Sequence, residues 1–181
     1  RAQVGGGLCP LTGELKAAVR ARAEELNGQG MRVLAVAQKV LPEGRAVSCE
    51  DEADMVLIGY LAFLDPPKET TAEAISRLHS LGVAVKILTG DNEKVTACIC
   101  RKVGLSGGSI LLGSDLENLN DEQLAAAAQK ATVFAKLSPA QKERVVRVLR
   151  ERGHGVGFKG AGINDAPAMR AADVGISGDT A

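Results

Sequence analysis

The clearest indication of the fold comes from residues Val83-Ala84-Val85-Lys86-Ile87-Leu88-Thr89-Gly90-Asp91. Its first six residues are mostly aliphatic or β-branched and predict a buried strand, which runs directly into a Thr-Gly-Asp turn. Apolar residues then recur at helical spacing from about Glu93 to Val103, and Gly104 predicts the end of that helix. A strand that leads through a short turn into a helix is the repeating unit of a parallel α/β sheet.

The same unit recurs on both sides of this stretch. Thr70 and Glu73 have the spacing of a capping box for a helix that reaches Gly82, and Asn120 and Ser138 predict the N-caps of two later helices. The last helix is expected to end near residue 172, and further strands are expected at residues 110–112, 132–135, 155–158 and 174–176. Parallel strands need crossover connections, so the sequence predicts an α/β fold with a parallel sheet and helices on both faces.

The N-terminal third has a different pattern. Helical spacing from Leu15 to Leu26 is followed by an apolar strand at residues 32–37, a polar loop, and a second strand at residues 55–63. The chain then reaches Asp65-Pro66-Pro67-Lys68, where two prolines remove backbone donors and stiffen the connection. We therefore expect a domain boundary at this point.

The composition excludes several classes of protein. The 181 residues carry 22 Lys and Arg against 22 Asp and Glu, so no global field attracts nucleic acid. Aromatic residues are few, with Phe 3, Tyr 1 and Trp 0, which argues against base stacking. The sequence has no run of about 18 apolar residues and no signal-peptide pattern, so it is expected to be soluble. The four cysteines have no zinc-binding spacing and are expected to be reduced thiols.

Three polar segments follow expected strands or open an expected helix, at the sheet edge where α/β proteins bind ligands. They are the Thr89-Gly90-Asp91 turn, Lys142 near a helix start, and the glycine-rich loop that ends in Asn164-Asp165. Hydroxyl and amide donors, a cation and carboxylates in such a place suit a phosphate with a magnesium ion. Taken singly, the first segment could be an ordinary turn and the second part of a solvated helix face.

Together, these segments resemble the P-type cation-transporting ATPases. The matching motifs occur in the order of that family over roughly Gly30 to Ser177. They are Phe63-Leu64-Asp65-Pro66-Pro67-Lys68, Ile87-Leu88-Thr89-Gly90-Asp91, Phe134-Ala135-Lys136-Leu137-Ser138-Pro139 with Lys142, and Gly162-Ile163-Asn164-Asp165-Ala166-Pro167. The chain is most similar to the bacterial magnesium-importing branch, although calcium pumps share the shorter motifs.

The resemblance implies two domains. Residues 1–64 would be the C-terminal part of a nucleotide-binding domain with a hinge strand. Residues 65–181 would be a haloacid-dehalogenase-like (Rossmann-like) phosphorylation domain. The parent protein would couple ATP hydrolysis, through an aspartyl phosphate, to Mg²⁺ transport at the cytoplasmic face of the bacterial inner membrane. Its partners would be ATP, the transported cation, and the pump's other domains and membrane helices, with no nucleic acid.

The resemblance also implies roles for individual residues. Thr89, Gly90 and Asp91 would surround the transferred phosphoryl group, Lys142 would pair with it, and Asn164 with Asp165 would orient the site. ATP would in addition be contacted by Arg32 and Lys136, although Arg32 could instead merely flank an edge strand.

Two departures from the family pattern limit this expectation. The Asp-Lys-Thr-Gly-Thr segment that carries the phosphorylated aspartate does not occur in these 181 residues, so we expect an inactive fragment that begins within the nucleotide-binding domain. Ala161 stands where the family has a magnesium-binding aspartate, which leaves Asp165 as the metal ligand, and Lys159 replaces an uncharged residue. A phosphatase of the same superfamily and an inactive nucleotide-binding module are the alternatives. The two prolines after Asp65 argue against the phosphatase.

Overall fold

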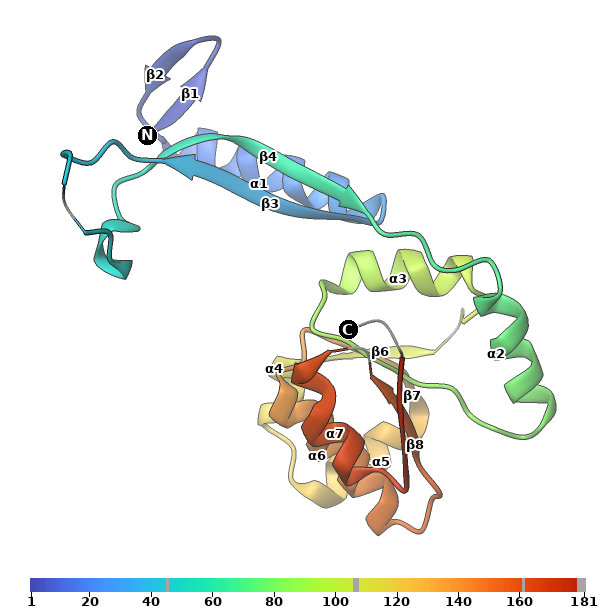
Figure 1. Ribbon diagram of the computed structural model, residues 1–181. Coiled ribbons are helices and arrows are strands. Elements are labelled where there is room, and N and C mark those ends of the chain that lie inside the picture. The colour runs from blue at the N-terminus through green and yellow to red at the C-terminus, as the bar shows by residue number, and fades with distance from the viewer. Residues whose placement is uncertain (45, 106–107, 161, 179–181) are drawn as a thin grey trace. The chain divides into compact units, whose positions relative to one another are not determined.

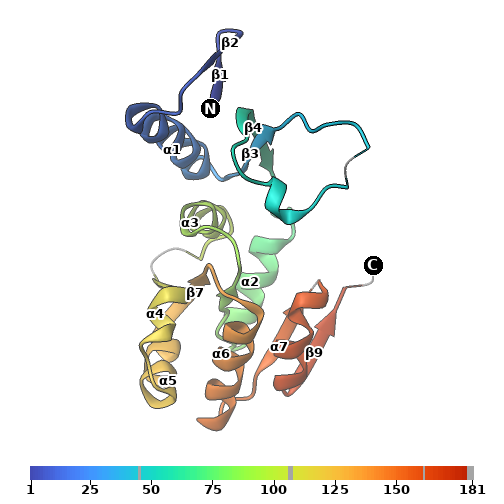
Figure 2. The same cartoon turned by 90° about the vertical axis from the view of Figure 1, so that its left-hand side faces the viewer.

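A computed structural model of the chain describes residues 1–44, 46–105, 108–160 and 162–178 (Figures 1 and 2). The chain divides into two compact units, Arg1–Pro66 and Pro67–Ala181, which we call the N-terminal unit and the C-terminal unit. It stays a prediction that residues 1–64 belong to a nucleotide-binding domain and residues 65–181 to a phosphorylation domain.

The described residues of the N-terminal unit form a four-stranded sheet, an α-helix and a short 3₁₀ turn, Cys49–Asp51. The strands are β1 (Ala2–Val4), β2 (Gly7–Cys9), β3 (Met31–Gln38) and β4 (Val56–Leu64), in the order β2-β1-β4-β3. Helix α1 (Gly13–Gly28) contacts β3, and the Tyr60 hydroxyl of β4 donates a 2.9 Å hydrogen bond to the Val19 carbonyl of α1. The sequence predicted α1, β3 and β4. The β1–β2 hairpin was missed because strands of three residues carry too little periodicity to be read.

The C-terminal unit contains two groups of parallel strands. The first is β5 (Ile87–Leu88), β7 (Ala131–Ala135) and β6 (Ser109–Leu112), paired in that order, and the second is β8 (Gly157–Gly160) with β9 (Val174–Ser177). The helices are α2 (Thr71–Ser80), α3 (Glu93–Lys102), α4 (Gly113–Glu117), α5 (Asp121–Lys130), α6 (Pro139–Glu151) and α7 (Ala166–Ala171).

Hydrophobic clusters cover both faces of the β5-β7-β6 sheet. On one face Phe134 packs with Leu124 of α5 and Val145 of α6, and all three side chains are fully buried. On the other face Val133 packs with Ile75 of α2 and Cys100 of α3. Figure 1 shows α3 and α5 on opposite sides of this sheet. The predicted α/β fold with a parallel sheet and helices on both faces is confirmed.

A third cluster joins the second pair of strands to the rest of the C-terminal unit. It consists of Val146 from α6, Phe158 from β8 and Ala168 from α7, and Leu88 of β5 packs against it. Helix α6 therefore contributes to two clusters, because Val145 and Val146 point to different sides of the helix.

Two local predictions are wrong. The strand expected at residues 83–88 is confined to Ile87–Leu88, because β5 pairs in the described residues only with β7 and Val83 is 46% exposed. The capping box at Thr70 is not formed. Thr70 already has helical backbone angles (φ −75°, ψ −6°), and among the described residues its side chain accepts no hydrogen bond from the start of α2.

The caps predicted at two other helices are confirmed. The Asn120 side chain accepts a 2.8 Å hydrogen bond from the Gln123 N–H at the start of α5. Ser138 caps α6 in the same way, with Pro139 in the first turn. The Ser138 cap lies on the connection from β7 to α6.

Candidate functional site

The Thr89-Gly90-Asp91 turn is fastened to the loop that follows β7. The Thr89 N–H donates to the Phe134 carbonyl, and the Leu137 N–H donates to the Thr89 carbonyl, both at 2.9 Å. The Lys136 N–H donates to the Asp91 carbonyl at the same distance. The carboxyl ends of two neighbouring parallel strands are thereby held together, at the edge of the sheet where α/β proteins bind ligands.

The turn itself is stabilised by its own side chains. The Asp91 N–H donates to Thr89 Oγ1 at 3.1 Å, and the Asn92 side chain caps α3 by accepting from the Lys94 N–H at 2.8 Å. Gly90 is exposed, and a Cβ atom added to it would lie 3.4 Å from the Leu137 carbonyl oxygen. Helix α3 begins directly after this turn, and the dipole at its capped N-terminus favours an anion.

Lys136 occupies an unusual backbone conformation beside this turn. Its φ of 55° lies in the left-handed region, and its ammonium lies 2.9 Å from Glu93 Oε2 at the start of α3. The hydrogen bond from Lys136, with help from a backbone N–H, holds the pKa of Glu93 below its usual value. The sequence interpretation assigned Lys136 to ATP and did not single out Glu93. No periodicity or motif signals this ion pair, because it depends on the left-handed turn at Lys136.

Lys142 and Asp165 lie together. The Lys142 ammonium donates a 2.8 Å hydrogen bond to Asp165 Oδ1, and the two side chains are only 15% and 18% exposed. Lys142 lies in the first turn of α6, and Asp165 ends a short 3₁₀ turn, Ile163–Asp165, that follows β8. The ion pair shows that α6 begins at the sheet edge where β8 ends.

Gly160 permits the close approach of Asp165. A Cβ atom added to Gly160 would lie 2.6 Å from the Asp165 Cβ and 3.1 Å from Met169 Sδ, which is too close for any real side chain. The first glycine of the glycine-rich loop is therefore needed because a side chain at this position would collide with Asp165 and Met169. Asn164 is exposed on the 3₁₀ turn, and Ala161 lies outside the described residues. The roles predicted for Asn164 and Asp165 stay predictions.

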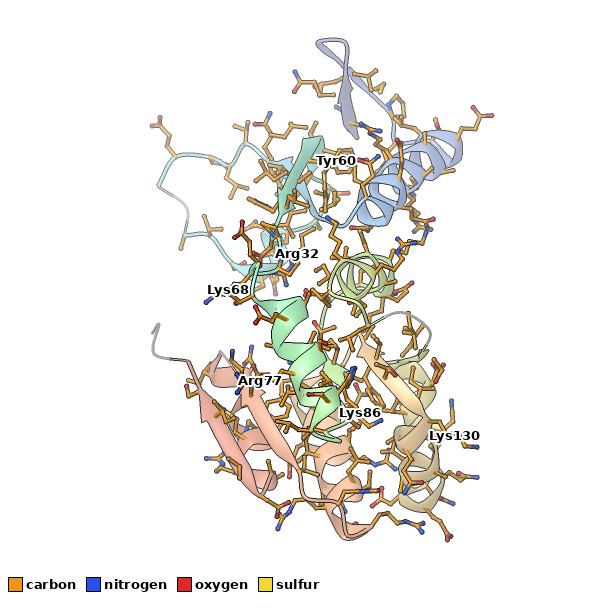
Figure 3. All side chains as sticks on the ribbon, turned by 90° about the vertical axis from the view of Figure 1, so that its right-hand side faces the viewer. Arg32, Tyr60, Lys68, Arg77, Lys86 and Lys130 are labelled. Atoms are coloured by element: carbon orange, nitrogen blue, oxygen red, sulfur yellow. The ribbon has the colours of Figure 1, made fainter. Side chains whose placement is uncertain are left out.

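Arg32 lies in the other unit. It is exposed on β3, opposite Phe63 of β4 in the strand register, and Figure 3 labels it together with Tyr60 of the same sheet. Arg32 belongs to the N-terminal unit, and its predicted contact with ATP stays a prediction.

The described residues do not by themselves form a magnesium site. Within residues 1–44, 46–105, 108–160 and 162–178, His, Cys, Asp and Glu nowhere form a group of three or more that could hold a metal ion. The Asp165 carboxylate is paired with Lys142, and the alanine side chain at position 161 has no oxygen to offer. A hard cation such as Mg²⁺ needs several oxygen ligands, so the metal role predicted for Asp165 lacks a partner here.

The cysteines give no sign of a metal or redox site. All four are free thiols, and Cys98 and Cys100 are buried in α3. Burial raises the pKa of the Cys100 thiol, which makes it less reactive.

Residues 14–173 match the haloacid dehalogenase-like hydrolases. The chain belongs to this family. It is 53% identical over 178 residues to a "Magnesium-transporting ATPase, P-type 1" of Salmonella typhimurium (strain 14028s / SGSC 2262), and 52% identical over 177 residues to the protein of that name in Escherichia coli K12. It is 38% identical over 185 residues to a "Probable cation-transporting ATPase F" of Mycobacterium bovis.

These alignments cover 97%, 97% and 95% of this chain but 20% of each relative. The resemblance to P-type ATPases inferred from the motifs is confirmed, and the chain spans about a fifth of the length of these relatives. In the part of the chain that the structure describes, no helix is long and apolar enough to cross a membrane.

Proposed function

We propose that this chain is part of a magnesium-transporting P-type ATPase, in which ATP hydrolysis through an aspartyl phosphate drives Mg²⁺ across the membrane. The observation that carries the proposal is the Lys142–Asp165 pair at the carboxyl end of β8, in a chain 53% identical to a protein named for that activity. In this proposal residues 1–64 close a nucleotide-binding domain and residues 65–181 form most of the phosphorylation domain.

The chemistry of the site suits a phosphoryl group. The Thr89 hydroxyl and the Gly90 N–H can donate to phosphoryl oxygens, and the Lys142 ammonium can balance their charge. Asp165 holds that ammonium in place through the 2.8 Å hydrogen bond, and Asn164 adds an amide to the same loop. Arg32 and Lys136 would contact the rest of ATP. Lys136 would then leave its ion pair with Glu93 and bind a phosphate group instead.

The whole protein would then act at the cytoplasmic face of the bacterial inner membrane. Its substrates would be ATP and the transported cation, and the domains and membrane helices of the same pump would be the partners of this chain. The 181 residues contain no Asp-Lys-Thr-Gly-Thr segment, so we expect no activity from them alone.

Labelling with radioactive ATP tests the proposal. The isolated 181-residue chain should form no acid-stable phosphoenzyme. The full-length protein carrying Ala161→Asp, which restores the missing carboxylate, should form one that hydroxylamine releases. A labelled, hydroxylamine-sensitive band from the isolated chain would show that another carboxylate is the nucleophile. A full-length protein that is never labelled, with or without Ala161→Asp, would refute the pump assignment.

A further inference from the structure

Helices α6 and α7 are joined by polar contacts at both ends. At one end the Lys142 ammonium donates to Asp165 Oδ1 at 2.8 Å. At the other end Arg150 Nε donates to Asp173 Oδ1, also at 2.8 Å, and Arg150 Nη1 donates to the Ala171 carbonyl at 2.7 Å. Figures 1 and 2 show the two helices side by side. A basic residue of α6 thus meets an acidic residue next to α7 at each end.

The spacing of these contacts shows that the two helices run in the same direction. Both ion pairs join residues 23 positions apart in the chain. Lys142 and Arg150 are eight residues apart on α6, and residues at steps of four lie on one face of a helix. Asp165 and Asp173 flank α7 at the same separation. Helix α7 therefore lies alongside α6 in one defined register.

Between the two ends the helices meet through small apolar side chains. Val146 of α6 packs in one buried cluster with Ala168 of α7, and Met169 lies against this cluster. Alanine offers no branched side chain that could lock into a groove, and α7, with six residues, is too short to be stable as an isolated helix. The position of α7 along α6 therefore depends on the directional hydrogen bonds at the two ends.

Asp173 also closes the segment that contains the site loop. Asp173 Oδ2 accepts a hydrogen bond from the Val156 N–H at 2.8 Å, and the Asp173 N–H donates to the Val156 carbonyl at 2.9 Å. The hydrogen bond from Val156 and the charge of Arg150 hold the pKa of Asp173 below its usual value, so its carboxylate is ionised at neutral pH. Residues 156 and 173, which lie before and after the site loop, are thus tied together, and Arg150 attaches this tie to α6.

We propose that Arg150 is a positioning residue, which holds Asp173, fixes the register of α7 on α6, and thereby keeps the Lys142 ammonium against Asp165 at the opposite ends of the helices. Eight residues of α-helix span about 12 Å, so Arg150 acts on the site through α6 and α7 and not by contact. The inference rests on the proposed function for what Lys142 does to a phosphoryl group. The register of the helices is independent of that role.

The Lys142 ammonium reports this register in the 181-residue chain. NMR detects the side-chain ammonium of a lysine when its protons exchange slowly with water, and Lys142→Arg identifies the signal by removing it. The ammonium is hydrogen-bonded to Asp165 and the side chain is only 15% exposed, so a slowly exchanging signal is expected. Arg150→Met should make these protons exchange at least about tenfold faster, because Asp165 is no longer held in place.

A second variant and a rescue make this test independent of one substitution. Asp173→Asn keeps an acceptor for the Val156 N–H but removes the charge that Arg150 holds, so it should speed the exchange in the same way as Arg150→Met. Arg150→Lys keeps a cation beside Asp173 but loses one of two donors, so the exchange should be at most about threefold faster than in the wild type.

Arg152 provides the matched control. It lies just after α6, and its guanidinium pairs with Glu122 of α5 at 3.5 Å, so it does not hold α7. Arg152→Met removes the same kind of side chain and breaks an exposed ion pair. The exchange of the Lys142 ammonium should therefore stay within about twofold of the wild type.

Three results would overturn the inference. The first is a wild type without a slowly exchanging Lys142 ammonium, and the second is the same exchange rate in the wild type, Arg150→Met and Asp173→Asn. The third is an equal effect of Arg152→Met, which would mean a general loss of stability. The ammonium is read without ATP, so a full-length protein that is never phosphorylated would refute the pump assignment and leave the positioning role of Arg150 intact.

Discussion

Lys142 and Asp165 are 23 residues apart in the sequence, yet the Lys142 ammonium lies 2.8 Å from Asp165 Oδ1 in a nearly buried ion pair. The pair links the first turn of α6 to the loop after β8, so it ties the two groups of parallel strands together at the end where a phosphate would bind. The same contact therefore serves the fold and the candidate site.

A double-mutant cycle on this pair measures its contribution to stability. Lys142→Met leaves the Asp165 carboxylate without its cation, and Asp165→Asn leaves the ammonium without its anion. Each should lower the free energy of unfolding by about 1–3 kcal/mol, with a coupling energy of about 1 kcal/mol or more. Denaturant unfolding provides the measurement, and strictly additive effects would show that the two groups do not interact.

Gly160→Ala should be destabilising for a steric reason. Its Cβ would lie 2.6 Å from the Asp165 Cβ, so the loop must shift at a cost of about 1–3 kcal/mol. Gly162→Ala is the matched control, because a Cβ there meets nothing within 4 Å, and it should change the stability by less than about 0.5 kcal/mol. Equal unfolding midpoints for the two variants would contradict the close packing of Gly160 on Asp165.

Glu93 makes a pH-dependent contribution to stability. Its pKa in the folded chain lies below its ordinary value, mainly because Lys136 donates to it, so the stabilisation is present above the ordinary pKa and is lost as the pH falls through the folded pKa. The difference in unfolding free energy between the wild type and Glu93→Gln should be largest near neutral pH and should shrink on acidification. Urea unfolding from pH 7 to pH 3 measures it. A difference that grows with falling pH would have the wrong sign.

Two substitutions of Lys136 measure the conformational strain of its left-handed backbone. Lys136→Ala and Lys136→Gly both remove the ion pair with Glu93, but only glycine adopts a φ of 55° without strain. Lys136→Gly should therefore be more stable than Lys136→Ala by about 1 kcal/mol. If the alanine variant proved the more stable in chemical denaturation, the loop would not hold this conformation in solution.

Much of the fold was predictable because its signals are local. The caps at Asn120 and Ser138, and the end of a helix at Gly104, where φ is 79°, depend on a few neighbouring residues. The strand at residues 83–88 was predicted too long, because an apolar run does not tell how many partners a strand will have. Thr70 failed as a cap because the chain reaches it already in a helical conformation.

The candidate site was predictable in part. The turn at Thr89 and the start of α6 at Lys142 follow from the alternation of strands and helices, which places such residues at one edge of a sheet. The ion pairs of Lys142 with Asp165 and of Lys136 with Glu93 were not predictable. The first depends on how β8 lies against α6, and the second on a left-handed residue that is not glycine.

Magnesium uptake by the full-length protein tests whether this chain is part of a magnesium pump. The host is a bacterial strain without magnesium transporters of its own, and the protein carries Ala161→Asp, alone or combined with Lys142→Met. We expect the single variant to take up magnesium from a dilute medium and the double variant, in which Lys142 is replaced as well, to lose this uptake. Uptake of calcium in place of magnesium, or uptake that does not depend on Lys142, would contradict it.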